Sequence, residues 1–235
     1  MWIDDQILER SAENYALRIW RPENSVVILG SGNKADLECN LNHCQKDQIE
    51  ILKRYGGGGT VLLHSGCAII SFGCWVRYHY KNDLYFDKMN SAVINCLQSR
   101  WPSLRHLTQE GISDIAYNHQ KICGTSLFRS RNYLLYQASI LVEDRIDFIN
   151  RYLSHPTKEP EYRQGKSHSE FLTNLQKIDN SITISDTVIQ LESSLISEIF
   201  SALDGELIES QSMQVPHILN KIHRHKNNTQ TNKTT

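Results

Sequence analysis

The chain has 235 residues, of which 40% are hydrophobic and 22% are charged, and this composition is typical of a globular protein rather than a disordered one. Its formal net charge is -1 at pH 7, so no overall field attracts nucleic acid or an anionic membrane, and we expect neither as a partner. The N-terminal "MWIDDQILER" is acidic where a signal peptide is basic, and no apolar run reaches the roughly 18 residues of a membrane span. The sequence therefore predicts a cytoplasmic protein.

The cysteines give no sign of a metal site. They form no C-x-x-C pair and no zinc-ligand spacing, so we predict no metal centre. In a reducing compartment we expect most of them to be small buried hydrophobic residues. The cysteines are Cys39, Cys44, Cys67, Cys74, Cys96 and Cys123.

The predicted elements alternate irregularly between helix and strand. In the first half, apolar spacing predicts a helix over residues 4–15, a buried strand over 25–30, a helix over 46–52 and a strand over 68–76. The second half is predicted to begin with a helix over 87–100, a hairpin over 114–124 that turns at Asn118 and His119, and a strand over 133–143. A short helix over 147–152 and a polar loop over 156–164 follow. The last predicted element is a helix over 186–203, with Ser185 as its N-cap and Gly205 at its end.

The order of these elements indicates a fold class. Because helices and strands mix without strict βα alternation, we predict an α+β fold with a mixed, largely antiparallel sheet flanked by helices. The polar "RHKNNTQTNKTT" predicts a disordered tail over residues 224–235. This leaves a main domain over 1–205 and a C-terminal extension over 206–223.

Four consecutive glycines stand in "KRYGGGGTVLLHSGCAIISF", residues 53–72. Glycine costs backbone entropy, so a run of four needs a physical reason. Such a loop exposes a row of backbone N–H groups that can bind phosphate, and Arg54 just before it carries a guanidinium suited to phosphate oxygens. The run is neither a Walker loop nor G-x-G-x-x-G, so on this motif alone a tight strand connection without a ligand remains the alternative.

A second cluster lies in "SDIAYNHQKICGTSLFRSRNYLLYQASILVE", residues 113–143. Taken alone, Lys121 is a solvated lysine in a hairpin, Asp114 is a turn residue and Gly124 is a bulge glycine. Each of these residues, considered by itself, is therefore explained by a structural role without a ligand.

Together, the segments resemble the catalytic domain shared by lipoate–protein ligases, octanoyl/lipoyl transferases and biotin protein ligases. The motifs that carry the resemblance are "KRYGGGGTV", "SDIAYNHQKICGTS", "YLLYQASILVE" and "YLSHPTKEPEYRQGKSHSEFLTNL", and their order and separations all fit. The resemblance implies the fold of that catalytic domain over residues 1–205 and a glycine loop that wraps an acyl-adenylate.

The resemblance also assigns residues by position. It implies that Lys121 is catalytic and contacts the acyl carbonyl and the phosphate. The implied nucleotide-binding residues are Arg54, Gly57, Gly58, Gly59, Thr60, Val61 and Leu62, and the implied substrate-binding residues are His64, Asp114, Gly124 and Thr125.

The leading prediction is a lipoate–protein ligase or lipoyltransferase. It would use ATP with Mg²⁺, or lipoyl-AMP, together with lipoate or octanoate, and would modify a lysine of an apo lipoyl carrier protein. When a carboxylate attacks the α-phosphorus of ATP two anions meet, so positioning and charge neutralisation by Lys121 suit the chemistry.

Two alternatives remain open. An octanoyl/lipoyl transferase working from an acylated carrier protein needs a nucleophilic cysteine, and strand alternation predicts Cys123 on the same face as Lys121. The second alternative is a non-catalytic paralogue that binds the acyl group or nucleotide and acts as a partner subunit.

The chain departs from the family pattern at several places. His64 stands one position later than the usual histidine, and Cys67 replaces an asparagine. Lipoate ligases usually carry a C-terminal accessory domain, whereas a short segment and a polar tail follow Leu203. We therefore expect that domain on a separate chain, or a protein that mainly transfers a preformed acyl group.

Overall fold

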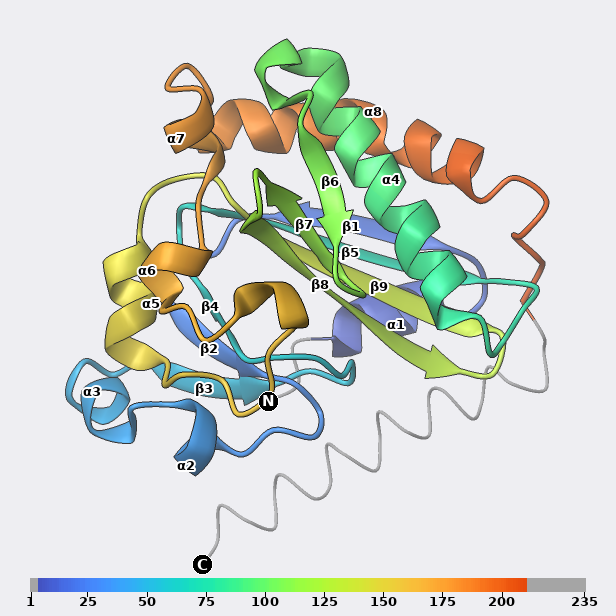
Figure 1. The fold of residues 1–235 in the computed structure, drawn as a ribbon. Helices are drawn as coiled ribbons and strands as arrows, with labels where there is room; N and C mark the ends of the chain where they lie inside the picture. Colours follow the sequence, from blue (N-terminus) through green and yellow to red (C-terminus); the bar gives the residue numbers. More distant parts are fainter. Residues whose placement is uncertain (1–3, 211–235) are drawn as a thin grey trace, which may run out of the picture.

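The computed structural model describes residues 4–210, and these residues fold around two β-sheets (Figure 1). The larger sheet has six strands in the order β1-β5-β9-β8-β7-β6, and every neighbouring pair is antiparallel. The smaller sheet has three strands in the order β3-β2-β4, with β2 parallel to β3 and antiparallel to β4. The predicted α+β class with a mixed, largely antiparallel sheet is confirmed.

The strands are β1 (Ala16–Trp20), β2 (Val26–Leu29), β3 (Glu50–Lys53), β4 (Val61–Leu63), β5 (Cys67–Trp75), β6 (Leu107–Glu110), β7 (Asp114–Tyr117), β8 (Gln120–Ser130) and β9 (Tyr133–Leu141). The helices are α1 (Asp5–Ser11), α2 (Ala35–Glu38), α3 (Leu41–Lys46), α4 (Asn82–Arg100), α5 (Ile146–Tyr152), α6 (His168–Phe171), α7 (Leu175–Ile178) and α8 (Ile184–Ala202), with 3₁₀ turns at η1 (Pro102–Leu104) and η2 (Glu161–Arg163).

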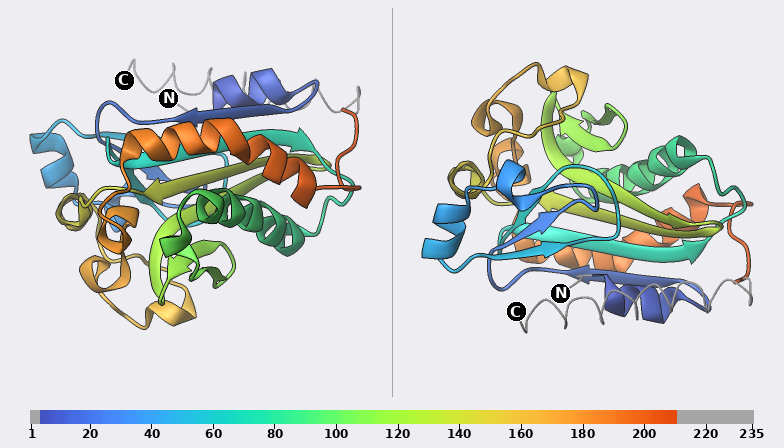
Figure 2. Two further views of the ribbon diagram at one scale, coloured as in Figure 1. Left: turned by 90° about the horizontal axis from the view of Figure 1, so that it is seen from above. Right: turned by 90° about the horizontal axis from the view of Figure 1, so that it is seen from below.

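Helices cover both faces of the larger sheet. The long helices α4 and α8 pack together on one face, and α1 lies on the other (Figure 2). The strand β5 lies between β1 and β9, and all its residues are buried. Phe72 faces the core under α4 and α8, whereas Trp75 packs with Leu8 of α1. Burial on both faces explains why this strand is a continuous apolar run rather than an alternating one.

The helix α8 is held to the sheet by the predicted apolar stripe. Leu191, Leu195 and Ile199 are fully buried, and complete burial of such a side chain contributes about 1.5–3 kcal/mol. The predicted N-cap, Ser185, is wrong because the helix already begins at Ile184. Thr183 caps it instead, in an extended conformation that lets its Oγ1 accept from the Asp186 N–H at 3.1 Å.

The predicted helix over 46–52 is also wrong. The helix α3 ends at Lys46, Gln48 takes a positive φ of 56°, and the chain then pairs with β2 as strand β3. Pairing with a distant strand overrides a short local pattern that is ambiguous between helix and strand.

The remaining predicted elements are present with shifted ends. The first helix stops at Ser11, and the helix predicted over 87–100 begins at Asn82. The hairpin turn at Asn118 and His119 is confirmed, and both residues have positive φ, as a tight two-residue turn requires.

All six cysteines are free and buried, which confirms their prediction as small core residues. Between residues 4 and 210 no helix is long and apolar enough to cross a membrane. Of the predicted C-terminal extension, residues 211–223 lie outside the described residues, as does the whole of the predicted tail over 224–235.

Candidate active site

A cavity of about 1330 Å³ is lined by residues of both sheets. Its wall is made by the loop after β2, the glycine loop between β3 and β4, the β7–β8 hairpin, and the segment between α5 and α6. Most predicted site residues line it, namely Gly57, Gly58, Gly59, Thr60, Val61, Leu62, Asp114, Lys121 and Gly124.

The four glycines of the loop differ in what surrounds them and in their backbone conformation. A Cβ on Gly56 would lie 3.1 Å from Ser126 Oγ, so this position packs closely on β8. Gly58 has a positive φ of 89°. A Cβ on Gly57 or Gly59 would meet nothing within 4 Å. Two glycines are thus explained by the fold, whereas Gly57 and Gly59 keep the backbone open towards the cavity.

Arg54 shapes the glycine loop from within. Its Nη2 donates to the carbonyl oxygens of Gly57 and Gly59, both at 2.7 Å, and its Nε donates to Gly57 at 3.2 Å. Arg54 is buried and does not line the cavity. Burial lowers the pKa of Arg54 to about 10, which leaves it protonated at neutral pH. Its direct contact with a phosphate remains a prediction.

Asp4 supports the loop from the start of the chain. Its carboxylate accepts from the Tyr55 N–H at 2.7 Å and from Gln137 Nε2 at 2.5 Å. Burial raises the pKa of Asp4 from 3.8 to about 6, although both hydrogen bonds and the charge of Arg54 oppose this rise. The loop is therefore sensitive to the charge of a buried carboxyl group.

Asp4→Asn is expected to make stability less dependent on pH. Because the folded state holds the Asp4 proton more tightly than the unfolded chain does, ionisation of Asp4 removes stability as the pH rises from about 4 to about 6. Asparagine stays neutral at all these pH values. Gln137 Oε1 is buried and has no partner in the described part of the chain. When the Gln137 amide is flipped, this oxygen accepts from the asparagine side-chain amide of the variant. We therefore expect the unfolding temperature of the variant, relative to that of the unmodified protein, to rise between about pH 4 and about pH 6. A difference that stays constant from pH 4 to pH 7 would contradict this account.

The loop after β2 braces the glycine loop, a role that was not predicted. A Cβ on Gly30 would lie 2.2 Å from the Gly58 oxygen. Asn33 Nδ2 donates to the same Gly58 oxygen at 3.2 Å and to Thr60 Oγ1 at 3.0 Å. The signal was present as "GSGN" directly after a buried strand, but its partner lies 25 residues further along the chain.

Lys121 lies across Gly124 on the wall of the cavity. Its Nζ forms an ion pair with Asp114 Oδ1 at 2.7 Å. A Cβ on Gly124 would lie 3.1 Å from both Cε and Nζ of Lys121, so glycine gives the lysine room to lie along the strand. The Lys121 side chain is 23% exposed and the Asp114 side chain 9%, so this cation is held partly desolvated at the cavity.

Cys123 lines the cavity together with Lys121, but a bulge in the hairpin changes the expected alignment of the two side chains. The register shifts between Ile115 and Ala116, and as a result Ile122 and Cys123 both belong to the hydrophobic core under α4 and α8. Lys121 shares its face with Gly124 instead. Burial raises the pKa of the Cys123 thiol, and burial also raises that of Cys67 to about 12.

His64 and Thr125 do not line the cavity. Burial, with a smaller contribution from Arg145, lowers the pKa of His64 to about 4, so its ring is neutral. Its Nδ1 accepts from the Gly66 N–H at 3.1 Å. Thr125 Oγ1 donates to the Ser113 carbonyl oxygen. Substrate binding by these two residues remains a prediction.

Residues 4–210 contain no group of three or more His, Cys, Asp or Glu side chains that could hold a metal ion.

Gly59→Ala is expected to weaken nucleotide binding without harming the fold. The new methyl group meets no protein atom within 4 Å, so the free energy of unfolding should change by less than about 0.5 kcal/mol. If the loop binds a nucleotide as predicted, however, the methyl group occupies space through which a phosphate would approach the backbone. Calorimetric titration with ATP and thermal unfolding measure the two effects.

Gly56→Ala is the matched comparison, because its methyl group would crowd Ser126 and Leu127. It should lower stability. If Gly59→Ala binds ATP as tightly as the unmodified protein, the loop does not hold the nucleotide.

The family model described as the lipoyl protein ligase A/B catalytic domain matches residues 1–196. The chain belongs to this family. The predicted boundary of the catalytic domain at residue 205 remains a prediction.

Several relatives in the family have been named. Lipoate–protein ligase 1 of Plasmodium falciparum is 28% identical over 176 residues, covering 74% of this chain and 40% of that protein. Lipoate-protein ligase A subunit 1 of Thermoplasma acidophilum is 29% identical, covering 68% of this chain and 63% of that protein. Inactive lipoate–protein ligase 2 of P. falciparum is 21% identical, covering 64% of this chain and 47% of that protein. The chain thus spans less than two thirds of each of these relatives.

Solved structures share the fold. A bi-partite lipoate protein ligase from T. acidophilum matches with a TM-score of 0.68 at 23% identity, covering 93% of this chain and 84% of that one. A lipoate-protein ligase A bound with ATP matches with a TM-score of 0.66 at 23% identity, covering 93% of this chain and 86% of that one. At this identity the likeness shows the fold alone.

Proposed function

We propose that this chain is a lipoate–protein ligase or lipoyltransferase that attaches lipoate, through lipoyl-AMP, to a specific lysine of a lipoyl carrier protein. The observation that carries the proposal is that the glycine loop and Lys121 line one cavity in a chain of the lipoyl protein ligase family. ATP with Mg²⁺, or preformed lipoyl-AMP, is the activated donor in this proposal.

The polar end of the cavity suits an acyl phosphate. The open backbone at Gly57 and Gly59 offers N–H groups to phosphate oxygens, and the Lys121 ammonium offers a compact positive charge. When the lipoate carboxylate attacks the α-phosphorus of ATP, Lys121 offsets the charge of the two anions as pyrophosphate leaves. In the transfer step the carrier amine attacks the acyl carbonyl, loses a proton and releases AMP, whose charge Lys121 again balances.

The apolar part of the cavity suits a medium-length acyl chain. Its lining there includes Leu62, Leu141, Ile149, Leu153 and Phe171. Each buried methylene contributes about 0.8 kcal/mol, which favours a chain long enough to fill this space. Such contacts distinguish lipoyl from octanoyl groups poorly, so either acid is a substrate in the proposal.

A separate accessory chain is part of the proposal for the adenylation step. Its support is the T. acidophilum relative, which is named as one subunit of its ligase, and the bi-partite ligase from the same organism. Transfer from preformed lipoyl-AMP is expected to need this chain alone.

The structure disfavours a thioester route. A transferase that takes the acyl group from another carrier needs a thiolate nucleophile. All six cysteines are buried, and burial raises the pKa of the two nearest candidates, Cys67 and Cys123. A non-catalytic paralogue is the second alternative, and a relative named as inactive gives it a specific basis.

One assay separates these functions. The protein is incubated with an apo lipoyl domain and with lipoate, ATP and Mg²⁺, and the mass of the lipoyl domain is measured. The assay is repeated with synthetic lipoyl-AMP and with an octanoylated carrier protein as donors. We expect the mass of the lipoyl domain to rise with lipoyl-AMP.

Cys123→Ala provides the control for the thiol route. It removes the thiol while keeping an apolar side chain in the core, so we expect the rate from lipoyl-AMP to stay close to that of the unmodified protein. Modification from the octanoylated carrier that disappears in this variant would support the transferase. Failure with every donor would support the binding paralogue.

A further inference from the structure

Lys121 is held at its main chain by the segment that follows α6. Lys121 and Leu172 form an isolated parallel bridge, and the Thr173 N–H donates to the Lys121 carbonyl oxygen at 2.9 Å. The backbone at Lys121 is therefore fixed, and the freedom that remains at this site belongs to the lysine side chain.

The side chain is held through Asp114, which has two partners on its two oxygens. Oδ1 accepts from Lys121 Nζ at 2.7 Å, and Oδ2 accepts from the Tyr162 hydroxyl at 2.9 Å. Burial and the neighbouring Asp114 carboxylate raise the pKa of Tyr162, so its hydroxyl keeps its proton and remains a donor. With both oxygens engaged, the carboxylate cannot rotate without losing a hydrogen bond in a site where Asp114 is only 7% exposed.

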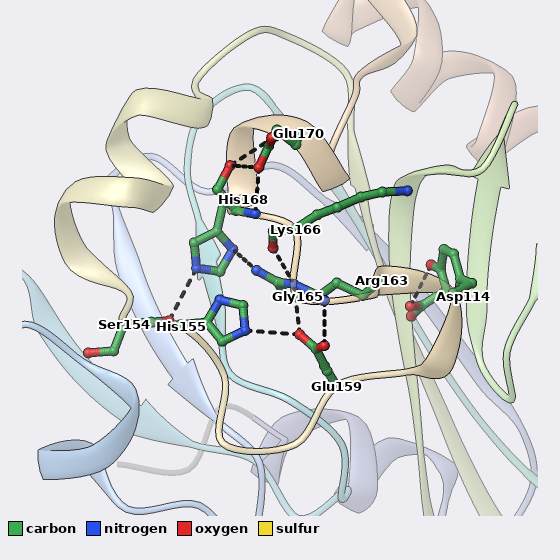
Figure 3. Close-up of polar contacts among 11 residues, drawn as sticks. Asp114, Ser154, His155, Glu159, Arg163, Gly165, Lys166, His168 and Glu170 are labelled. Atoms are coloured by element: carbon green, nitrogen blue, oxygen red, sulfur yellow. Dashed lines mark hydrogen bonds and ion pairs between the residues drawn. The ribbon is translucent and has the colours of Figure 1, made fainter.

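Tyr162 comes from a segment whose own contacts fix its position. Glu159 accepts from the Gly165 N–H at 2.7 Å and lies 2.9 Å from His155 Nε2, while Arg163 Nε donates to the Lys166 carbonyl oxygen at 2.9 Å (Figure 3). These bonds make the segment between α5 and α6 a compact loop, and Asp114 lies beside it at the right of the view.

Packing then places the Tyr162 ring. The Tyr162 ring lies 5.0 Å from the Phe171 ring, measured between centroids. The buried Arg163 guanidinium also packs on Phe171, with its Cζ 4.8 Å from the centroid of that ring. A Cβ on Gly111 would lie 3.6 Å from Tyr162 Cε1, so the turn between β6 and β7 bounds the ring as well.

We propose that Tyr162 is a positioning residue that fixes the Lys121 ammonium through Asp114. By occupying Oδ2, the hydroxyl takes part of the negative charge of the carboxylate and limits how tightly Asp114 binds Lys121. The lysine is thereby kept in place yet remains available to an incoming anion. The inference rests on the proposed function in so far as that anion is an acyl phosphate.

Competitive labelling of the full chain tests the link without using enzymatic activity. Trace acetic anhydride acetylates amines, and mass spectrometry gives the rate at Lys121 relative to the other lysines. In Tyr162→Phe the ring and its packing remain, but Oδ2 loses its donor and Asp114 pairs more tightly with Lys121. We expect labelling of Lys121 to slow about three- to tenfold.

A matched control variant exists on α5. The Tyr152 hydroxyl donates to Asp47 Oδ2 at 3.1 Å, but Asp47 is paired with Arg151 rather than with a lysine. Tyr152→Phe therefore removes an equivalent bond and should leave the labelling of Lys121 unchanged.

Asp114→Asn completes a double-mutant cycle. If Tyr162 acts through Asp114, adding Tyr162→Phe to Asp114→Asn has no further effect on Lys121. The inference is overturned if Tyr162→Phe leaves the labelling of Lys121 unchanged or faster, or if its effect is the same in both backgrounds.

Transfer from lipoyl-AMP gives the second readout and separates the two proposals. We expect Tyr162→Phe to lower kcat about tenfold with little change in KM, since the phenylalanine ring keeps the shape of the cavity wall at which Tyr162 lies. If the unmodified protein transfers nothing, the proposed function fails while the labelling result still decides the role of Tyr162.

Discussion

Lys121→Ala is expected to lower the rate of lipoyl transfer from lipoyl-AMP by about 100- to 1000-fold, the usual loss when one group that stabilises developing charge is removed. The variant lacks the ammonium group, and it leaves the buried Asp114 carboxylate without its cation at the wall of the cavity. That uncompensated charge repels the acyl phosphate. Single-turnover mass measurements on the lipoyl domain give the rate.

Lys177→Ala is the matched control for the lysine. Lys177 Nζ also pairs with an aspartate, Asp144 Oδ2 at 2.9 Å, but both side chains are about half exposed and the pair lies outside the cavity. We expect transfer by this variant to match that of the unmodified protein. If Lys121→Ala keeps a rate within about tenfold of the unmodified protein, Lys121 is not the group that balances charge.

Gly30→Ala is expected to damage both stability and nucleotide binding. The new Cβ would lie 2.2 Å from the Gly58 oxygen, so the glycine loop must move away from the loop after β2. Overpacking of this kind costs about 1–3 kcal/mol, and the displaced loop also loses the bracing bond from Asn33. Thermal unfolding and titration with ATP measure the two losses.

Gly32→Ala separates this effect from a general effect of alanine in the same loop. A Cβ on Gly32 meets nothing within 4 Å, so we expect the unfolding temperature to stay that of the unmodified protein. If Gly30→Ala and Gly32→Ala unfold alike, contact between the two loops does not set the position of the glycine run.

The parts of the site that could be predicted are those with local signals. The glycine run is visible by itself, whereas Lys121 was assigned through the resemblance to a family, and the structure places both at the cavity. The long apolar strands could also be predicted, because burial on both faces is written directly in the sequence of β5.

What could not be predicted depends on partners far along the chain. A guanidinium beside a glycine loop suggests a phosphate ligand, yet the donors of Arg54 bind the carbonyl oxygens of Gly57 and Gly59. The support from Asp4 crosses more than fifty residues to reach Tyr55 and Gln137. Tyr162 lies in a stretch that is simply polar in sequence, and its role requires knowing that Asp114 lies opposite.

The error at Cys123 has a different cause. Strict alternation along a strand fails at a bulge, and the extra residue in β8 buries Cys123 in the core at the wall of the cavity, while Lys121 lies on the face of Gly124. A single register shift thus changes the face of the strand on which a thiol at the cavity lies.

The burial of every cysteine makes the protein a natural reporter of its own opening. Cys74 and Cys96 lie in the core of the larger sheet, whereas Cys39 and Cys44 lie in the core beside the smaller one, and none of these four lines the cavity. A thiol reagent added to the native protein can react only when one of these interiors is exposed to solvent. Comparing the reaction rates of the cysteines in the two cores would show whether the regions around the two sheets unfold locally and independently or open as one cooperative unit.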